Sequence, residues 1–412
     1  MSCLHYHHQM LYIEDVSLEK IAQEFGTPCY VYSRQAIENN WRQFDAAFQA
    51  KAHRICYAVK ANSNLAILNL LANLHSGFDI VSFGELMRVI AAHGDTQKTV
   101  FSGVGKTEFE IEQAIYHQIH CFDVESQPEL IRLNAIAEKL NKKINIAFRI
   151  NPDVNPNTHT HIATGLKENK FGIALDDVIP LAKLLVNFPK LNLIGIAAHI
   201  GSQITELKPF IKMIQQLAEI YTQLIKMNFS INEINVGGGL GITYHHESPP
   251  TLQNYADAII HQFQNDPVQI ILEPGRAIVG NAGILITRVE YLKQSPHKNF
   301  IVADAGMNDL LRPALYDAWQ PILPVQLRDM PKVHYDITGP VCESADFLGK
   351  NRELAILPGD YLAIDCAGAY GFSMSSNYNS RCKPAEVLVD KTNIRLIRHR
   401  EAVEDLFAHE MI

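Results

Sequence analysis

The sequence lacks the features of secreted, zinc-binding and membrane-spanning proteins. Its seven cysteines are scattered, odd in number and without a Cys-x-x-Cys pair, which predicts neither a disulfide framework nor a bound metal. No apolar run approaches the roughly 18 residues of a membrane span, and the first residues lack the basic and then apolar pattern of a signal peptide. We therefore expect a protein of the reducing cytoplasm.

A strong excess of charge is also missing. The 412-residue chain carries 36 Lys and Arg against 44 Asp and Glu, a formal net charge of -8, and no run of like charges forms a tail. A protein without a basic surface is a poor partner for nucleic acid or anionic lipid. We therefore expect a small polar or zwitterionic substrate, and neither a nucleic-acid nor a membrane partner.

The central part of the chain alternates short apolar runs with helical patterns, of which residues 207–227 are the clearest. Eight strands are predicted, at residues 55–60, 78–81, 100–102, 121–124, 144–150, 193–199, 233–236 and 269–272. Parallel strands covered on both faces have this apolar character, so the count predicts an α/β fold with a (β/α)8 barrel. A doubly wound open sheet is the alternative.

The pattern changes after about residue 280. Short β-branched runs bounded by Pro, Gly or Asn predict a mostly antiparallel β domain, with strands at residues 284–291, 299–304, 333–338, 361–364, 386–389 and 394–397. Near the N-terminus, a strand at 29–32 precedes Ser33, which is typical of a helix N-cap. We expect two domains, a barrel at 33–282 and a β domain formed by 1–32 and 283–412.

Polar residues follow the predicted barrel strands at their carboxyl ends, where barrel enzymes carry their active sites. Examples are Lys60, Asp79, Ser102, Asp123, Glu125, Arg149, His199 and Glu273. Residues 237–239 are three glycines, which offer backbone N–H groups without a Cβ and suit a phosphate. The next strand leads into Glu273-Pro274-Gly275-Arg276, and barrels often bind phosphate between their last two strand loops.

A lysine amine, a glycine loop, a histidine and a glutamate at one barrel mouth predict a pyridoxal phosphate site. Lys60 would bond to the coenzyme, His199 could lie flat on its ring, and Glu273 would keep the pyridine nitrogen protonated. Each group also has a simpler interpretation: a solvated lysine at a strand end, a core histidine, or a tight glycine turn.

Motifs along nearly the whole chain, from about Thr27 to Val389, resemble the diaminopimelate decarboxylase family. They include CYAVKANSN, GFDIVSFGEL, FRINPDV, HIGSQI, INVGGGLG, ILEPGRAIVGNAG, DAGMNDLLRPALYDA and GPVCESADFLG. The resemblance implies a fold-type III enzyme that uses pyridoxal 5'-phosphate to convert meso-2,6-diaminopimelate into L-lysine and carbon dioxide, the last step of lysine biosynthesis. It also implies an alanine-racemase-like barrel and a head-to-tail homodimer with shared active sites. One departure is His161, where the family often has tyrosine.

The resemblance implies roles for individual residues. The catalytic residues would be Lys60 as the Schiff-base lysine, His199, Glu273, and Cys342 of the partner subunit as the proton donor. Coenzyme contacts would come from Lys60, Asp79, Arg149, His199, Ser202, Gly238, Gly239, Glu273, Gly275, Arg276 and Tyr370. Substrate contacts would come from Arg276, Arg312, Tyr316, Glu343 and Tyr370.

The residues themselves agree with such a substrate. A substrate whose distal end is itself an amino acid needs a cation for its carboxylate and an anion for its ammonium group, and Arg312 and Glu343 supply that pair. An ornithine decarboxylase would need only the anion, and an amino-acid racemase is disfavoured by Glu273. A non-catalytic coenzyme carrier or inhibitor is disfavoured by the presence of Lys60, Cys342 and a second domain.

Overall fold

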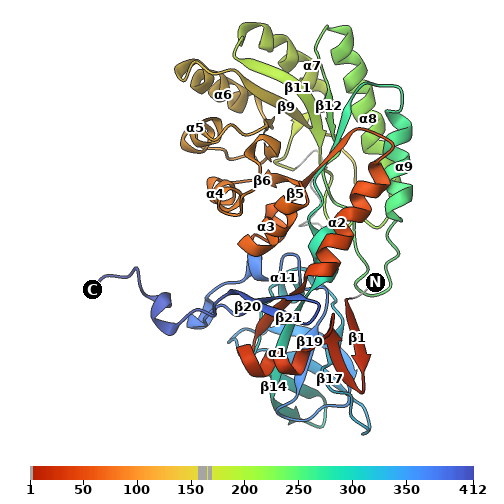
Figure 1. Ribbon diagram of the computed structural model, residues 1–412, viewed down its shortest axis with the longest axis vertical. Coiled ribbons are helices and arrows are strands. Elements are labelled where there is room, and N and C mark those ends of the chain that lie inside the picture. The colour runs from red at the N-terminus through yellow and green to blue at the C-terminus, as the bar shows by residue number, and fades with distance from the viewer. Residues whose placement is uncertain (1–2, 156–164, 166–168) are drawn as a thin grey trace. The chain divides into compact units, whose positions relative to one another are not determined.

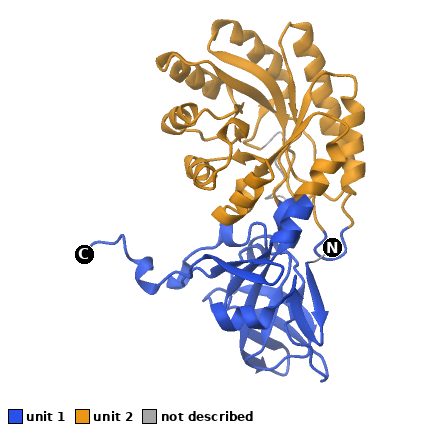
Figure 2. Ribbon diagram, in the orientation of Figure 1, with its two compact units in different colours: residues 1–40, 243–247, 276–412 blue, residues 41–242, 248–275 orange. Residues whose placement is uncertain are grey.

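The computed structural model describes residues 3–155, 165 and 169–412 (Figure 1). His161 and much of the long connection 151–172 therefore lie outside the described residues. The chain forms two compact units (Figure 2). Unit 1 contains residues 1–40, 243–247 and 276–412, and unit 2 contains residues 41–242 and 248–275.

Unit 2 is a closed barrel of parallel strands. In order around the barrel these are β5 (His53–Ala58), β6 (Gly77–Ile80), β7 (Thr99–Phe101), β8 (Cys121–Val124), β9 (Ile144–Asn151), β11 (Leu191–Ala198), β12 (Glu233–Asn235) and β13 (Gln269–Leu272). β13 pairs with β5 and β8 pairs with β9, so the sheet closes on itself. The predicted (β/α)8 barrel is confirmed, and the open-sheet alternative is wrong. The two-residue strand β10 (Ile173–Ala174) pairs with the end of β9.

The seven helices described between the strands of unit 2 begin at a capping side chain in five cases. They are α3 (Leu65–Asn73), α4 (Phe83–Ala91), α5 (Glu108–Tyr116), α6 (Gln127–Lys139), α7 (Leu175–Leu184), α8 (Leu207–Lys226) and α9 (Leu252–Gln262), and Figure 1 shows them outside the strands. Thr107 and Glu110 form a reciprocal capping box at the start of α5. The hydroxyl groups of Ser82 and Thr251 cap α4 and α9, each by accepting one hydrogen bond from a backbone N–H group. Such caps satisfy N–H groups that a helix leaves without an internal partner.

Unit 1 is a mostly antiparallel β structure, as predicted. Its larger sheet contains β4 (Cys29–Ser33), β14 (Gly283–Gln294), β15 (Asn299–Ala303), β16 (Ile322–Pro324), β17 (Val333–Thr338), β18 (Phe347–Leu354), β19 (Tyr361–Ile364), β20 (Ala385–Asp390) and β21 (Asn393–Arg398). Two of its pairings, β15 with β17 and β20 with β4, are parallel. A smaller sheet contains β1 (Leu4–His7), β2 (Met10–Ile13) and β3 (Val16–Ser17).

The N-terminal strand β4 lies inside the larger sheet, between β14 and β20. Its Val31 is fully buried and belongs to an apolar cluster with Ile13, Leu18, Ile286 and Val387. Burying a side chain of this size stabilises a fold by about 1.5–3 kcal/mol.

Unit 1 also contains the helices α1 (Leu18–Phe25), α10 (Arg276–Val279) and α11 (Arg312–Tyr316). Ser33 ends β4, and its hydroxyl accepts a hydrogen bond from the N–H of Ala36 in α2 (Arg34–Phe48), which confirms the predicted cap.

Candidate active site

Lys60 follows the first barrel strand, but it does not lie in it. The predicted strand at 55–60 is wrong at its end, because β5 stops at Ala58 and Lys60 lies in a 3-10 helix, Val59–Ala61. The pairing between β5 and β6 ends at Ala58 and Asp79, so the chain turns immediately afterwards. This turn places the Lys60 amine in an ion pair with Oδ2 of Asp79.

Asp79 is almost fully buried, with 1% of the residue exposed. Its second oxygen, Oδ1, has no hydrogen-bond partner among the described residues. A buried carboxylate that is paired mainly with one amine holds that amine in place, because separating them would leave an uncompensated charge. Asp79 therefore orients Lys60.

The three glycines after β12 are required by the backbone around them. Gly237 has φ +65°, and a Cβ at Gly237, Gly238 or Gly239 would lie 2.5, 2.2 or 2.5 Å from a backbone oxygen. Any side chain would force the turn apart, since real Cβ atoms do not approach so closely. A Cβ on Gly275 would lie 2.9 Å from the Cβ of Ala61, so the chain also passes tightly beside the Lys60 turn.

His199 directly follows β11 and contacts the glycine turn. Its Nδ1 accepts a hydrogen bond from the N–H of Gly238, at 3.2 Å. Burial lowers the pKa of His199 well below its ordinary value, and the nearby cations Arg149 and Lys60 lower it further. The ring is therefore neutral, with its proton on Nε2, and it presents a flat surface without charge.

Glu273 follows β13 and belongs to a cluster of buried carboxyl groups. Its Oε1 accepts a 2.6 Å hydrogen bond from Nδ2 of Asn235, the last residue of β12. Burial raises the pKa of Glu273 well above its ordinary value, and the negative charges of Asp79 and Asp123 raise it further. Burial likewise raises the pKa of Asp123 to about 7. Glu273 therefore retains a proton at a pH where an exposed glutamate would have lost it.

Arg149 lies near the end of β9 and forms a 2.8 Å ion pair with Glu125. The same carboxylate accepts hydrogen bonds from the backbone N–H groups of Gly103 and Gly172, at 2.7 and 3.1 Å. Glu125 thus joins the loop after β7 to strand β9 and to Gly172, at the end of the long connection 151–172. The Arg149 charge reaches His199, whose pKa it lowers, but no contact that the structure describes joins Arg149 to Lys60.

In unit 1, two buried arginines contact one tyrosine. Nη1 of Arg276 donates a 2.5 Å hydrogen bond to the hydroxyl of Tyr244, and its guanidinium lies 4.9 Å from the ring centroid of Tyr370. The Arg312 guanidinium lies 4.5 Å from the Tyr244 ring. Burial lowers the pKa of Arg312, and the positive charge of Arg276 adds to that effect. Tyr316 is the last residue of α11, the helix that begins at Arg312.

Arg312 is 5% exposed, and its Nε and Nη1 have no hydrogen-bond partner among the described residues. Buried cations are normally paired, because desolvating a charge without a partner is costly. A carboxylate ligand would supply that partner.

Cys342 and Glu343 lie in an exposed loop between β17 and β18 of unit 1. The Cys342 N–H donates to Oδ1 of Asn379 at 3.0 Å, and the Glu343 carboxylate accepts from Tyr378. The loop is therefore held by a second segment of the same unit.

The structure brings together two groups of the predicted residues. Within unit 2 they are Lys60, Asp79, His199, Gly238, Gly239, Glu273 and Gly275, with Ser202 near the glycine turn. Within unit 1 they are Arg276, Arg312 and Tyr370. The sequence analysis missed the contacts of Asn235, Tyr244 and Tyr378. Asn235 offers one signal, since it stands two residues before the glycine run at a strand end.

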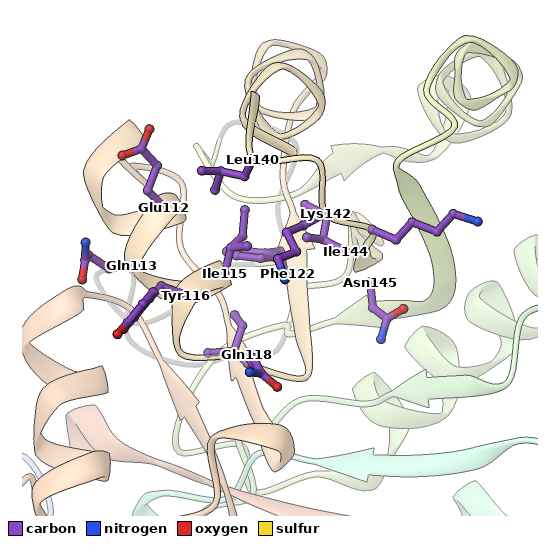
Figure 3. A pocket seen from close by; sticks show the side chains of 12 residues that line it. Glu112, Gln113, Ile115, Tyr116, Gln118, Phe122, Leu140, Lys142, Ile144 and Asn145 are labelled. Atoms are coloured by element: carbon purple, nitrogen blue, oxygen red, sulfur yellow. The ribbon is translucent and has the colours of Figure 1, made fainter. Parts of the chain in front are cut away.

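A separate pocket lies at the opposite ends of the strands. It has a volume of about 710 Å³ and includes Phe122 of β8, Tyr116 of α5 and Ile144 at the start of β9 (Figure 3). None of the predicted site residues lines it. Within the described parts of the chain, no group of His, Cys, Asp and Glu is arranged to hold a metal ion, and no helix has the length and apolar character needed to cross a membrane.

The unit 2 residues fit pyridoxal phosphate. The three glycines carry no side chain that could exclude a phosphate, the Lys60 amine is held by Asp79, and the neutral His199 ring can stack on an aromatic ring. The proton on Glu273 suits a pyridine nitrogen.

Comparison with known proteins agrees with this fit. The family described as "Pyridoxal-dependent decarboxylase, pyridoxal binding domain" matches residues 34–280. Diaminopimelate decarboxylase of Haemophilus influenzae is 50% identical over 412 residues, covering 100% of this chain and 99% of the relative. That of Vibrio cholerae is 51% identical, covering 98% and 97%. A crystal structure of diaminopimelate decarboxylase from M. jannaschii in complex with L-lysine has a TM-score of 0.95 and 40% identity, covering 99% and 98% of the two chains. The resemblance is confirmed: this chain belongs to the diaminopimelate decarboxylase family of pyridoxal phosphate-dependent enzymes.

Proposed function

We propose that this protein decarboxylates meso-2,6-diaminopimelate to L-lysine and carbon dioxide, the last step of lysine biosynthesis. Full-length relatives with this name support the proposal, as does the related structure that contains L-lysine. Within this chain, the observation that carries it is the buried Arg312 guanidinium, with two nitrogens that lack partners among the described residues. A substrate with a second carboxylate would satisfy them, whereas ornithine has none to offer.

Pyridoxal phosphate, when bound, supplies an electron-withdrawing ring that stabilises the negative charge left by departing carbon dioxide. Lys60 would bond to it, with Asp79 holding the amine. His199 would cover one face of the ring, and Glu273 would provide a proton at its nitrogen. Arg149 would act through its charge on His199. The family match at 34–280 supports our assignment of residues 33–282 to the coenzyme-binding domain.

The phosphate would be bound by the backbone of Gly238, Gly239 and Gly275, with Ser202, Arg276 and Tyr370 around it. The glycines support the first part of this arrangement, because they carry no side chain that could exclude a phosphate. The distal carboxylate of the substrate would pair with Arg312, and Arg276, Tyr316 and Tyr370 would complete its binding. A guanidinium binds a carboxylate with two parallel hydrogen bonds, which fixes orientation as well as charge.

We further propose a homodimer with shared active sites, located in the cytoplasm. Cys342 of the partner subunit would donate the proton that replaces carbon dioxide, and Glu343 of the partner subunit would bind the distal ammonium group. The exposure of both residues in the single chain supports this role. All seven cysteines are unpaired, which supports a reducing compartment.

The direct test is to incubate the purified protein with pyridoxal phosphate and either meso-diaminopimelate, ornithine or arginine, and to measure released carbon dioxide. We expect release from meso-diaminopimelate alone. Equal release from ornithine would contradict the role of Arg312 in substrate choice.

A further inference from the structure

Asn235 links the glycine turn to the carboxyl group of Glu273. It is 4% exposed and ends β12, beside β13 in the barrel. Its Oδ1 accepts a 2.9 Å hydrogen bond from the N–H of Gly237, and its Nδ2 donates to Oε1 of Glu273 at 2.6 Å. The N–H of Glu273 in turn donates to the carbonyl of Gly237 at 2.8 Å. One short side chain therefore connects the two loops proposed to bind opposite ends of the coenzyme.

The hydrogen bonds determine how the Asn235 amide is oriented. A backbone N–H can only donate, so the amide atom that meets Gly237 must be the oxygen. The amide nitrogen then faces Glu273, and its second hydrogen points toward Oδ2 of Asp123, at 3.5 Å. The hydroxyl of Ser102 also donates to that oxygen of Asp123, at 3.3 Å.

This orientation makes the two oxygens of Glu273 different. An amide N–H cannot accept a hydrogen bond, so Oε1 must act as an acceptor. Because a carbonyl oxygen accepts more strongly than a hydroxyl oxygen, this bond favours the proton of Glu273 on Oε2, the oxygen that does not contact Asn235.

We propose that Asn235 is a positioning residue that holds Oε1 of Glu273 as an acceptor and so leaves Oε2 as the oxygen that exchanges a proton with the coenzyme. The inference rests on the proposed pyridoxal phosphate chemistry and assigns a role to a residue outside the predicted site. Asn235 also fixes the position of the Glu273 carboxyl group relative to the glycine turn. One residue therefore aligns the group that would contact the coenzyme ring with the turn that would bind its phosphate.

Two substitutions separate this role from simple packing. Asn235→Ala removes both hydrogen bonds. Asn235→Asp has nearly the same shape and can still accept from Gly237, but the introduced carboxyl group donates to Glu273 only while it is protonated. Asn192→Ala is the control, because Asn192 is an exposed barrel residue that hydrogen-bonds another strand through its side chain.

The charges around position 235 predict the pH dependence of the aspartate variant. Asp79 on β6, Asp123 on β8 and Glu273 after β13 oppose ionisation of the introduced group, while Lys60, Lys106 and Arg149 favour it; the neutral His199 lies beside the glycine turn. Burial also opposes ionisation. The introduced carboxyl group is therefore protonated at low pH and donates, and it loses this ability as the pH rises.

The measurements are the dissociation constant of pyridoxal phosphate, the pH titration of its visible absorbance on the protein, and kcat and KM. For Asn235→Ala we expect weaker coenzyme binding and a lower kcat, each on the order of ten- to hundredfold, the cost of leaving a buried hydrogen-bonding group without its partner. KM for diaminopimelate should change little. Asn235→Asp should resemble the unchanged protein at low pH and Asn235→Ala at high pH.

An Asn235→Asp variant whose absorbance and kcat follow those of the unchanged protein at every pH would overturn the proposal, whether or not Asn235→Ala folds. Failure of the proposed function itself would look different: the unchanged protein and the Asn192→Ala control would then both fail to bind the coenzyme.

Discussion

The hydroxyl of Tyr378 donates a 2.5 Å hydrogen bond to Oε1 of Glu343. This bond raises the pKa of Tyr378, because ionising the hydroxyl would place a second negative charge against the carboxylate. The neighbouring Asn379 holds the backbone of Cys342 in the same manner. Residues 378 and 379 therefore position the two loop residues to which we assign roles at the substrate.

Tyr378→Phe should loosen this loop. We expect KM for meso-diaminopimelate to rise about two- to fivefold, the range of an exposed charged contact, with a smaller change in kcat. Steady-state kinetics measure both constants. Tyr291→Phe is the matched control, because Tyr291 is an exposed tyrosine of the same unit, 69% accessible. Equal effects of the two changes would show that the contact with Glu343 is irrelevant.

Lys60 should carry the coenzyme. Borohydride reduction of the loaded enzyme, followed by peptide mapping, should place the label on Lys60, because Asp79 holds this amine after the first barrel strand, where its charge reaches His199. Lys60→Ala should remove the label and the activity together. Lys106 is the internal comparison, since its buried amine is already paired with Glu129. A label on Lys106 or another lysine would contradict the assignment.

Glu273→Gln should retain the coenzyme but lose turnover. The glutamine keeps the size of the side chain but cannot exchange a proton with the ring nitrogen. We expect kcat to fall on the order of 10²–10³-fold, as for the loss of a single preorganised electrostatic contact. Absorbance of the bound coenzyme verifies loading, and single-turnover kinetics measure the step. Near-normal turnover would mean that another group protonates the ring.

Arg312→Met should raise KM for diaminopimelate by about tenfold or more, because a charge-assisted contact is removed while Glu343 remains. Arg352→Met is the matched control. Arg352 is another buried arginine of unit 1, and it stacks on Trp319 at 4.0 Å instead of contacting Tyr244. If the control raises KM as much as the test variant, the distal carboxylate binds elsewhere.

Mixing Lys60→Ala with Cys342→Ala chains tests the shared site. Each variant alone should be inactive. Random exchange makes about half of the dimers mixed, and each mixed dimer has one intact site, so about a quarter of the full activity should return. Native mass spectrometry measures the exchange. If exchange occurs and no activity returns, each chain completes its own site.

Local patterns in the sequence predicted the elements more reliably than the contacts. The bounds of β8, β13, β17 and β19 agree with the prediction to the residue, because apolar runs end there at turn-forming residues. β18 was missed, since it contains Lys350 and Asn351, and Asn351 adopts φ 51° at an irregular point of the strand. A strand that contains polar residues and a residue with left-handed backbone does not show the alternation of apolar and polar residues from which strands are predicted.

The same limit applies to the site. The sequence predicted that residues at the strand ends lie close together, because a barrel brings the carboxyl ends of its strands to one face. The bond from Asn235 to Glu273 joins residues 38 positions apart, and that from Arg276 to Tyr244 joins residues 32 positions apart. Such pairs depend on which side chains face each other after folding, which a single sequence does not encode in any local pattern.

The place of β4 between β14 and β20 has a consequence for biosynthesis. β4 is translated before every residue of unit 2, and β20 is translated after all of them. While the barrel is translated and folds, β4 lacks both neighbours and exposes hydrogen-bonding edges that can pair wrongly. Premature termination anywhere before residue 385 therefore leaves unit 1 without the strand that covers one edge of β4, even when the barrel is complete.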